Sequence, residues 1–418
     1  MGESKSVKDL VPEPNYDESK VGQYSLPQTL LSRSGNIVND QNAWSSRRLE
    51  LLGQFSEFVY GYTPEIDYSL EFEEISCKYD AIKGLATRRE ISLTPLRNNK
   101  SFVINILIYT PNNAPLPVPT FLGCNYRGNQ SIENCSEIQI SKRWMRNTDD
   151  GVGVKNNQAT EASRGSDQQS WPVETIISRG YGLATFYYGD VEADHVEGWR
   201  ERIRGLILPS QDSALFAPNS WGAIGAWAWG LSRALDFLEI DKSVAKEAVA
   251  LVGHSRLGKA ALWAAAQDER FAMVIANNSG KGGASLVRRN FGESINDLNL
   301  GFPHWFAGNY KNFNQNPSQL PVDSHDLLSL IAPRPIYIAS AEDDLWADPK
   351  GEFLGALGAD PVYSMFGKVG LGTTICPSIH SPVGSYIRYH IRSGGHGVTK
   401  YDWQEFLNFA DHHLLNEQ

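Results

Sequence analysis

Cysteine is scarce in this chain of 418 residues, which contains only Cys77, Cys124, Cys135 and Cys376. No two of them are spaced as C-x-x-C, so the sequence argues against a structural zinc site. One disulfide, between Cys124 and Cys135, is compatible with the pattern, and so are four free thiols. Hydrophobic residues make up 41% of the chain, which is ample for a buried core.

Basic residues are also fewer than acidic ones, with 38 Lys and Arg against 48 Asp and Glu, so the formal net charge is −10 at pH 7. Binding to phosphate backbones needs a basic surface, so we expect no nucleic-acid partner. A local basic pocket for an acidic substrate remains compatible with this balance. No apolar run reaches the length of a membrane helix, and the first residues lack an apolar signal core. We therefore expect either an intracellular protein or one whose signal segment has been removed, and no membrane partner.

Strand and helix patterns alternate along the chain, without internal repeats or low-complexity segments. Such alternation predicts a mainly parallel sheet covered by helices on both faces, an α-β-α sandwich of three layers. The expected strands include 68–93, 102–109, a strand that begins at Thr120, 181–188, 271–277, 335–340 and 385–391. The expected helices are 44–60, 221–240, 260–267 and 401–415.

The domain organisation that we expect is one domain over residues 1–418. Its polar, proline-bearing segment 1–34 would wrap the surface. Residues 138–170 and 189–218 lack clear periodicity, and we interpret them as insertions around the cleft.

The stretch Ala250–Ala266 organises the rest of the chain. An apolar strand run is followed by the turn Gly253-His-Ser-Arg-Leu-Gly258 and then by an alanine-rich helix. Strand, tight turn with a serine and helix is the layout of the nucleophile elbow of α/β-hydrolases, although Leu257 stands where the common G-x-S-x-G pattern has glycine. The amide of Arg256 would lie at a helix N-terminus and stabilise an oxyanion. The alternative is an ordinary strand-to-helix turn with a solvated serine.

A serine hydroxyl needs a base, and an imidazole base needs an acid behind it. His396 is flanked by glycines between the last strand and the last helix, where this fold carries the base. Four acids, Glu342, Asp343, Asp344 and Asp348, follow the strand that ends near Ser340. Proximity to the strand favours Asp343 or Asp344, whereas Asp348-Pro349 suits a helix cap. A second oxyanion amide is expected in the loop from Cys124 to Gly128.

These residues resemble a known family. Gly253-His-Ser-Arg-Leu-Gly-Lys259 is similar to the G-x-S-R-x-G-K signature of the glucuronoyl esterases, carbohydrate esterase family 15, in its bacterial branch. Further similar segments follow in the family's order over about residues 250–403, whereas the N-terminal third matches only in layout. These further similar segments are Asn278–Ala284, Arg288–Glu293, Phe302–Phe306, Asp344–Pro349 and Gly394–Gly397.

The resemblance implies an α/β-hydrolase fold and a set of site residues. Ser255 would be the nucleophile, His396 the base, and Arg256 would assist the oxyanion with its amide and guanidinium. Three further residues would contact the substrate, each with an ordinary alternative. Lys259 would reach sugar hydroxyls or be a solvated helix lysine. Glu293 would accept hydrogen bonds from the uronate or be a helix-surface carboxylate, and Trp346 would line the sugar pocket or pack in the core.

One position departs from the family pattern. Many members carry the triad glutamate just after the strand that follows the elbow helix, and here that position is Asn278. An amide cannot stabilise an imidazolium by charge. The family's other acid position, two residues before the pocket tryptophan, holds Asp344, and we therefore predict Asp344 as the sole triad acid.

The expected function is hydrolysis of esters that join 4-O-methyl-glucuronate of glucuronoxylan to lignin alcohols, through an acyl-enzyme. No metal or cofactor is required for this chemistry. The substrate implies a secreted or periplasmic enzyme, and we expect a monomer. Two other hypotheses stand beside it: an acetyl-xylan or other carbohydrate esterase, and an inactive carbohydrate-binding homologue.

Overall fold

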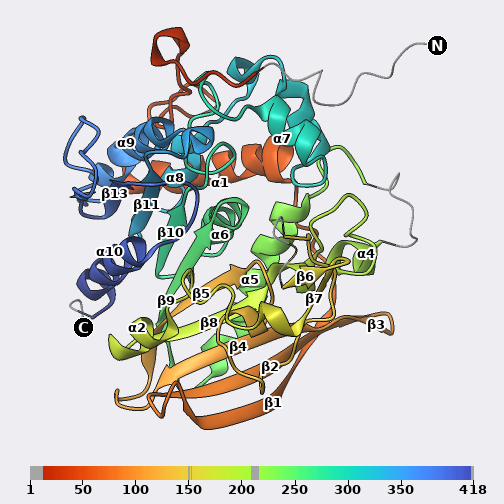
Figure 1. Cartoon of the computed structure of the whole chain (residues 1–418). Helices are drawn as coiled ribbons and strands as arrows, with labels where there is room; N and C mark the ends of the chain where they lie inside the picture. The colour runs from red at the N-terminus through yellow and green to blue at the C-terminus, as the bar shows by residue number, and fades with distance from the viewer. Residues whose placement is uncertain (1–12, 149–150, 152, 209–215, 416–418) are drawn as a thin grey trace. The chain divides into compact units, whose positions relative to one another are not determined.

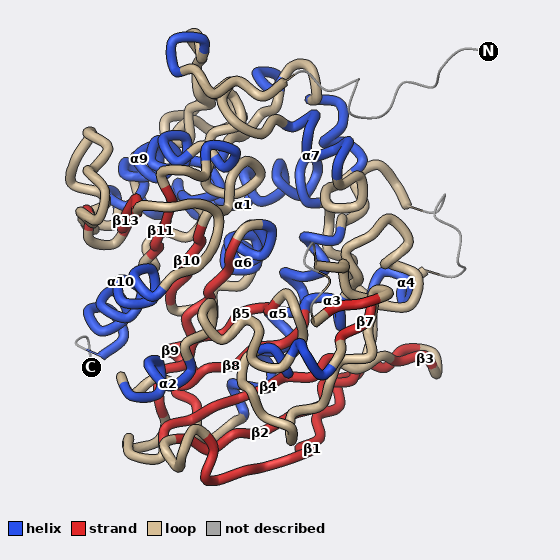
Figure 2. The backbone as a smooth tube through the Cα atoms, viewed as in Figure 1, coloured by secondary structure: helices blue, strands red, loops and turns tan. Residues whose placement is uncertain are grey.

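The computed structural model of the chain describes residues 13–148, 151, 153–208 and 216–415. The chain forms two compact units. Unit 1 contains Met1–Thr63, Phe216–Gly225 and Ala276–His396, and unit 2 contains Pro64–Leu215, Ala226–Ile275 and Gly397–Gln418. Figure 1 labels the elements, and Figure 2 separates helices, strands and loops.

Unit 2 is built on a sheet whose strand order is β1-β2-β4-β8-β5-β9, with β3 paired to β2. The strands from β1 to β8 in this order pair antiparallel, whereas β8, β5 and β9 pair parallel. The larger strands are β1 Ser69–Ala81, β2 Ala86–Arg97, β4 Ile104–Pro111, β5 Val118–Asn125, β8 Gly182–Tyr187 and β9 Val244–His254. The short strands are β3 Lys100–Ser101, β6 Val154–Lys155 and β7 Gln158–Ala159, the last two forming a separate pair.

Helices cover both faces of the sheet in unit 2. The ring of Phe72 on β1 lies 5.5 Å from that of Phe237 on α5 Ala223–Ile240. The ring of Phe121 on β5 lies 5.4 Å from that of Trp403 on α10 Lys400–Ala410. Side chains alternate between the two faces along a strand, and the pairing register places Phe72 and Phe121 on opposite faces. Further helices of this unit are α2 Val173–Ser178, α3 Tyr188–Val191, α4 Ile203–Ile207 and α6 Arg256–Gln267.

Strand β10, Met273–Asn277, spans the division between the units. In unit 1 the strand order continues from β10 through β11 Ile336–Ala341 and β13 Ile387–Arg392 to β12 Val383–Gly384. β11 and β13 run parallel, and β12 pairs antiparallel to β13. The helices of unit 1 are α1 Gln41–Phe55, α7 Ile295–Gly301, α8 Ser324–Ser329 and α9 Pro349–Met365. α9 packs on β11 and β13 and also contacts α8, as Figure 1 shows.

Most predicted strands begin and end within about two residues of the observed ones. The stretch 68–93, expected as one strand, instead forms β1 and β2, which pair antiparallel because the chain reverses at Ile82–Leu85, where Gly84 takes a φ of 85°. The helix predicted over 260–267 begins earlier, at Arg256. The helix predicted over 44–60 begins earlier, at Gln41, because the Asp40 side chain caps it by accepting a hydrogen bond from the Ala43 amide. Its last turn, Ser56–Tyr60, widens to a π-helix. The α/β-hydrolase fold is confirmed, with a parallel sheet that begins at β8 rather than at β1.

The four cysteines are all free, so no Cys124–Cys135 disulfide forms. No helix among the described residues has an apolar stretch long enough to cross a membrane. The single-domain organisation and the insertions stay predictions. Parts of the segments 1–34, 138–170 and 189–218 lie outside the described residues, namely 1–12, 149–150, 152 and 209–215.

Candidate active site

The predicted nucleophile lies on a strained turn in unit 2. β9 ends at His254, Ser255 has φ 54° and ψ −129°, and α6 begins at Arg256. A positive φ is costly for a residue with a Cβ, and such strain is typical of a nucleophile elbow. Gly253 permits the tight turn, because a Cβ there would lie 2.2 Å from the carbonyl oxygen of Leu257. The predicted strand, turn and helix are therefore present, with the Arg256 amide in the first turn of α6.

Tyr126 is a neighbour of this turn that the sequence did not single out. Its hydroxyl donates a 2.6 Å hydrogen bond to the carbonyl oxygen of His254. Burial raises the pKa of Tyr126 to about 12, while the nearby charge of Arg256 and a side-chain hydrogen bond with Ser255 oppose that rise. The residue belongs to the loop after β5 that was expected to supply an oxyanion amide. Its position in this loop was the only sequence feature that could have pointed to Tyr126, because its hydrogen bond to His254 depends on the fold.

The guanidinium of Arg256 is held by a carboxylate that was also missed. Nη1 of Arg256 forms an ion pair with Oδ2 of Asp194, whose side chain is fully buried. The same oxygen accepts from Tyr188 Oη at 3.3 Å and lies 3.4 Å from Nη2 of Arg146. The Arg256 guanidinium also lies 5.5 Å from the centre of the Tyr126 ring. These contacts restrict the direction in which the cation points.

The predicted acid and base meet in unit 1. Nδ1 of His396 lies 2.6 Å from Oδ2 of Asp344, within hydrogen-bonding distance. Both residues follow paired parallel strands, since Ala341 at the end of β11 is in register with Arg392 at the end of β13. The amide of Asp343 donates to the carbonyl oxygen of Gly394 at 3.1 Å and joins the two loops. Asp344 is 6% exposed, and 45% of the His396 side chain is exposed.

Asn278 contributes to the same pair. Its Nδ2 donates a 2.8 Å hydrogen bond to Oδ2 of Asp344, the oxygen that contacts His396. Burial opposes ionisation of Asp344, but the hydrogen bond and charge of His396 and the bond from Asn278 hold its pKa below the usual value. The amide of Asn278, which stands where many family members carry the triad glutamate, therefore favours the ionised form of Asp344.

Of the competing acids, Asp348 is the cap of a helix, as the sequence suggested for Asp348-Pro349. Its Oδ1 accepts from the Gly351 amide at 3.0 Å, at the start of α9. It also forms a buried ion pair with Nε of Arg289 at 3.0 Å. Asp343 is exposed, in contrast to Asp344.

For each of the three predicted substrate residues, the structure contradicts the ordinary alternative to a role in substrate binding. Glu293 is 5% exposed and precedes α7, so it is no helix-surface carboxylate; its Oε1 accepts from the Lys281 amide at 2.8 Å. Trp346 is 39% exposed and so lies outside the core. Its carbonyl oxygen accepts from the Glu293 amide at 2.9 Å, so these two residues are neighbours. Lys259 on α6 is 3% exposed and is no solvated lysine.

The predicted residues thus form two groups. Unit 1 brings together Asp344 and His396, and in the same unit Glu293 contacts Trp346. Unit 2 carries Ser255, Arg256 and Lys259 on one elbow. A serine elbow on an α/β-hydrolase sheet, in a chain that also carries a carboxylate–imidazole pair after later strands, defines the class of carboxylic ester hydrolases.

Comparison with known proteins identifies the family within this class. The family model for fungal glucuronyl esterases matches residues 182–367. The chain is 41% identical over 401 residues to carbohydrate esterase MZ0003 from an unknown prokaryotic organism, covering 96% of this chain and 92% of that protein. This chain belongs to carbohydrate esterase family 15, the glucuronoyl esterases.

Solved structures agree with this assignment. A glucuronoyl esterase from Solibacter usitatus is 44% identical, with a TM-score of 0.89 over 95% of this chain and all of that one. A promiscuous esterase of the same family from a marine bacterial metagenome is 40% identical, with a TM-score of 0.88 over 96% of this chain and all of that one.

Proposed function

We propose that this chain hydrolyses the ester between 4-O-methyl-glucuronate of glucuronoxylan and a lignin alcohol, with Ser255, His396 and Asp344 as a catalytic triad. The observation that carries the proposal is the 2.6 Å contact between His396 Nδ1 and Asp344 Oδ2. With Nδ1 held by the carboxylate, Nε2 would be the ring nitrogen that accepts a proton from a serine hydroxyl. A relative from Podospora anserina that is named 4-O-methyl-glucuronoyl methylesterase supports the substrate class, at 33% identity over 175 residues.

The reaction runs in two acyl-transfer steps. His396 accepts the hydroxyl proton of Ser255 while Ser255 Oγ forms a bond to the ester carbonyl carbon. The tetrahedral intermediate collapses, the bond to the alcohol oxygen breaks, and the alcohol leaves with the proton that His396 returns. Water then attacks the glucuronoyl-enzyme by the same route, which releases the uronic acid and restores Ser255.

The negative charge of each intermediate would rest on backbone amides. One is the Arg256 amide at the start of α6, and the other lies in the loop Cys124–Gly128 after β5. The Arg256 side chain would add a cation, oriented by its ion pair with Asp194. That pairing keeps the guanidinium from folding away, although it also reduces the net positive charge that the oxyanion experiences.

Sugar recognition is assigned to Lys259, Glu293 and Trp346. Glu293 and Lys259 are nearly buried polar groups, which suits hydrogen bonds to hydroxyls in a water-poor pocket. The half-exposed Trp346 offers a flat apolar surface for a sugar ring. We expect a secreted or periplasmic monomer that needs no nucleic acid, membrane, metal or cofactor.

The decisive experiment is hydrolysis of benzyl glucuronate by the wild type and by Ser255→Ala. We expect turnover by the wild type and a loss of roughly 10⁴-fold or more in kcat in the variant. Ser136→Ala, at an exposed position of unit 2, is the matched control and should keep wild-type rates. Absence of turnover by the wild type, together with binding of xylooligosaccharides, would favour the inactive binding homologue instead.

A broader carbohydrate esterase is the second candidate, because the metagenomic relative at 40% identity is described as promiscuous. The two candidates are separated by kcat/KM. The main proposal requires a higher value for methyl or benzyl glucuronate than for acetylated xylose, and the reverse order would support the second candidate.

A further inference from the structure

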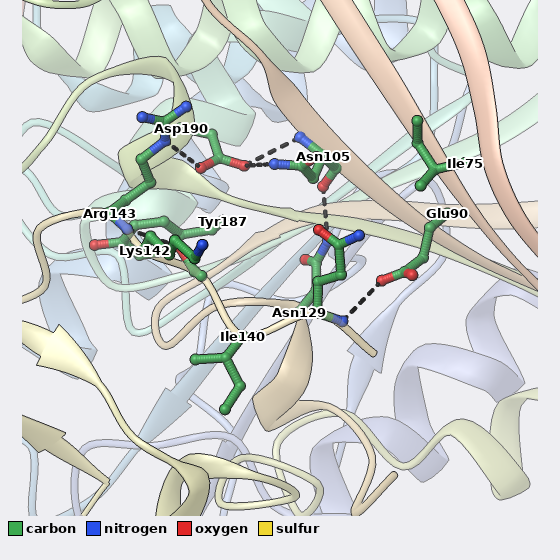
Figure 3. Close-up of a pocket in the computed structure, with 11 residues that line it drawn as sticks. Ile75, Glu90, Asn105, Asn129, Ile140, Lys142, Arg143, Tyr187 and Asp190 are labelled. Carbon is green, nitrogen blue, oxygen red and sulfur yellow. Dashed lines mark hydrogen bonds and ion pairs between the residues drawn. The ribbon is translucent and has the colours of Figure 1, made fainter. Parts of the chain in front are cut away.

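A polar cavity of about 280 Å³ lies in unit 2, on one face of its sheet. Glu90 on β2, Asn105 on β4 and Tyr187 at the end of β8 share this face, because Asn105 pairs with Ser92 two residues from Glu90 and strand side chains alternate. The loop Gln139–Arg143 completes the lining (Figure 3). The lining residues differ from those assigned to ester hydrolysis.

Asp190 is the most constrained group in this cavity. It belongs to α3, is 2% exposed, and its Oδ2 accepts from the amide and from Nδ2 of Asn105 at 3.0 and 3.3 Å. Its Oδ1 accepts no hydrogen bond from the described residues, and Nε of Arg143 stands 3.8 Å away (Figure 3). Burial raises the pKa of Asp190 to about 6. A buried carboxylate oxygen without a donor is costly, so a bound hydroxyl would be stabilised there.

Two further polar side chains of the lining are held in place by hydrogen bonds. Asn129 Nδ2 donates to the carbonyl oxygen of Asn105 at 2.7 Å, and Asn129 Oδ1 accepts from Asn125 Nδ2 at 2.9 Å. Glu90 Oε1 accepts from the amide of Gln139 at 3.4 Å. A chain of hydrogen bonds therefore extends from Asp190 through Asn105 and Asn129 to the loop after β5.

The charges of the cavity decide the class of ligand. Two cationic side chains, Arg143 and Lys142, line it together with two anionic ones, Asp190 and Glu90. An anionic ligand would face the open oxygen of Asp190, and a cationic one would face the guanidinium. A neutral ligand rich in hydroxyl groups avoids both conflicts. Ile75, Ile140 and the Tyr187 ring add apolar surface suited to the C–H face of such a ligand.

We propose that this cavity binds one neutral sugar ring, a pentose or a hexose, with a hydroxyl donating to Oδ1 of Asp190. The volume lies just below the range of about 300–1,000 Å³ for drug-sized ligands, which suits a single ring. The inference goes beyond ester hydrolysis, because it concerns a neutral sugar and a separate set of residues.

The test is saturation-transfer NMR on the whole chain with methyl β-D-xyloside and methyl β-D-glucoside. We expect binding with a Kd on the order of millimolar for so small a ligand. Asp190→Asn should weaken it about tenfold or more, because a charged acceptor is lost. Gln139→Ala, which removes an exposed side chain and spares the core, should weaken it several-fold. Gln168→Ala, also exposed in unit 2, should bind as the wild type does.

Three results would overturn the proposal: no saturation transfer from either glycoside, wild-type affinity in both Asp190→Asn and Gln139→Ala, or binding of D-glucuronate in place of the neutral glycosides. A neutral xylotetraose that binds more tightly than the monosaccharides would identify a ring within a chain as the ligand. Equal affinities for xylotetraose and the monosaccharides would identify a free sugar or a chain end as the ligand. Neither glycoside carries an ester, so a negative result leaves the esterase proposal intact.

Discussion

The elbow at Ser255 and the pair formed by Asp344 and His396 are built in different ways. The elbow uses neighbours in sequence: Gly253, Ser255 and the first turn of α6 lie within a few residues. The acid and base are 52 residues apart and meet because two parallel strands end together. A local motif therefore reveals the nucleophile, whereas the acid is identified only by the pairing of distant segments.

Among the variants that test this difference, Asp344→Asn should have the largest effect on kcat. The amide keeps the shape of the side chain but cannot stabilise a positive imidazole, so kcat on benzyl glucuronate should fall by about 10⁴-fold. Asp343→Asn is the adjacent control, since Asp343 is exposed, and its kcat should stay near that of the wild type. Near-normal kcat in Asp344→Asn with a large loss in Asp343→Asn or Asp348→Asn would reject the assignment.

A smaller effect is expected of Asp194→Asn, on the elbow side of the comparison. Removing the carboxylate leaves the Arg256 guanidinium without the ion pair that orients it. We expect kcat/KM for benzyl glucuronate to fall by about 10- to 100-fold. Asp80→Asn, at an exposed position on β1, serves as the control. An unchanged kcat/KM would mean that the direction of the guanidinium is unimportant for the reaction.

Asn278 should matter less, because it adds one hydrogen bond to an acid already in place. We expect Asn278→Ala to lower kcat by about tenfold or less. Asn278→Asp instead places a second carboxylate beside Asp344 and His396, which raises the pKa of a neighbouring carboxyl and of the imidazole. The acid limb of the pH–rate profile should therefore move to higher pH, and an unmoved limb would show that position 278 does not act on the pair.

The smallest effect on kcat is expected of Glu352→Gln, which instead changes stability. Glu352 is fully buried and accepts from the Gly280 amide at 2.9 Å and from Ser340 Oγ at 2.6 Å. Burial raises its pKa to about 8, against about 4.3 in an unfolded chain. Between these two pKa values the carboxyl is protonated in the folded state but ionised in the unfolded chain. The free energy of unfolding of the wild type therefore falls as the pH rises from the lower value to the higher one.

Glutamine resembles the protonated carboxyl and does not titrate. We therefore expect urea unfolding at pH 5 and pH 8 to show that the free energy of unfolding of Glu352→Gln, relative to that of the wild type, increases with pH. The increase should be up to about 1.4 kcal/mol per pH unit. The same comparison with Glu73→Gln, at an exposed position on β1, should give no such gain. A constant difference between wild type and Glu352→Gln at the two pH values would contradict a raised pKa.

Much of the site was predictable from sequence because its signals are local. The turn through Ser255, the glycine-flanked His396 and the strands before them follow from short patterns. Tyr126 and Asp194 were missed because their roles arise from contacts across 128 and 62 positions, to His254 and Arg256. An isolated tyrosine or aspartate in a loop carries no pattern that announces such a contact.

Residue order alone was enough to establish the alternation of strands and helices, the serine elbow and the resemblance to the glucuronoyl esterases, since backbone propensity and motif spacing are local properties. Folding decided which of four neighbouring acids faces His396, and it turned Asn278 into a donor to that acid. It also left Oδ1 of Asp190 without a hydrogen-bond donor among the residues that the structure describes, in a polar cavity. These outcomes depend on burial and on strand register, which bring together groups that the linear chain keeps far apart.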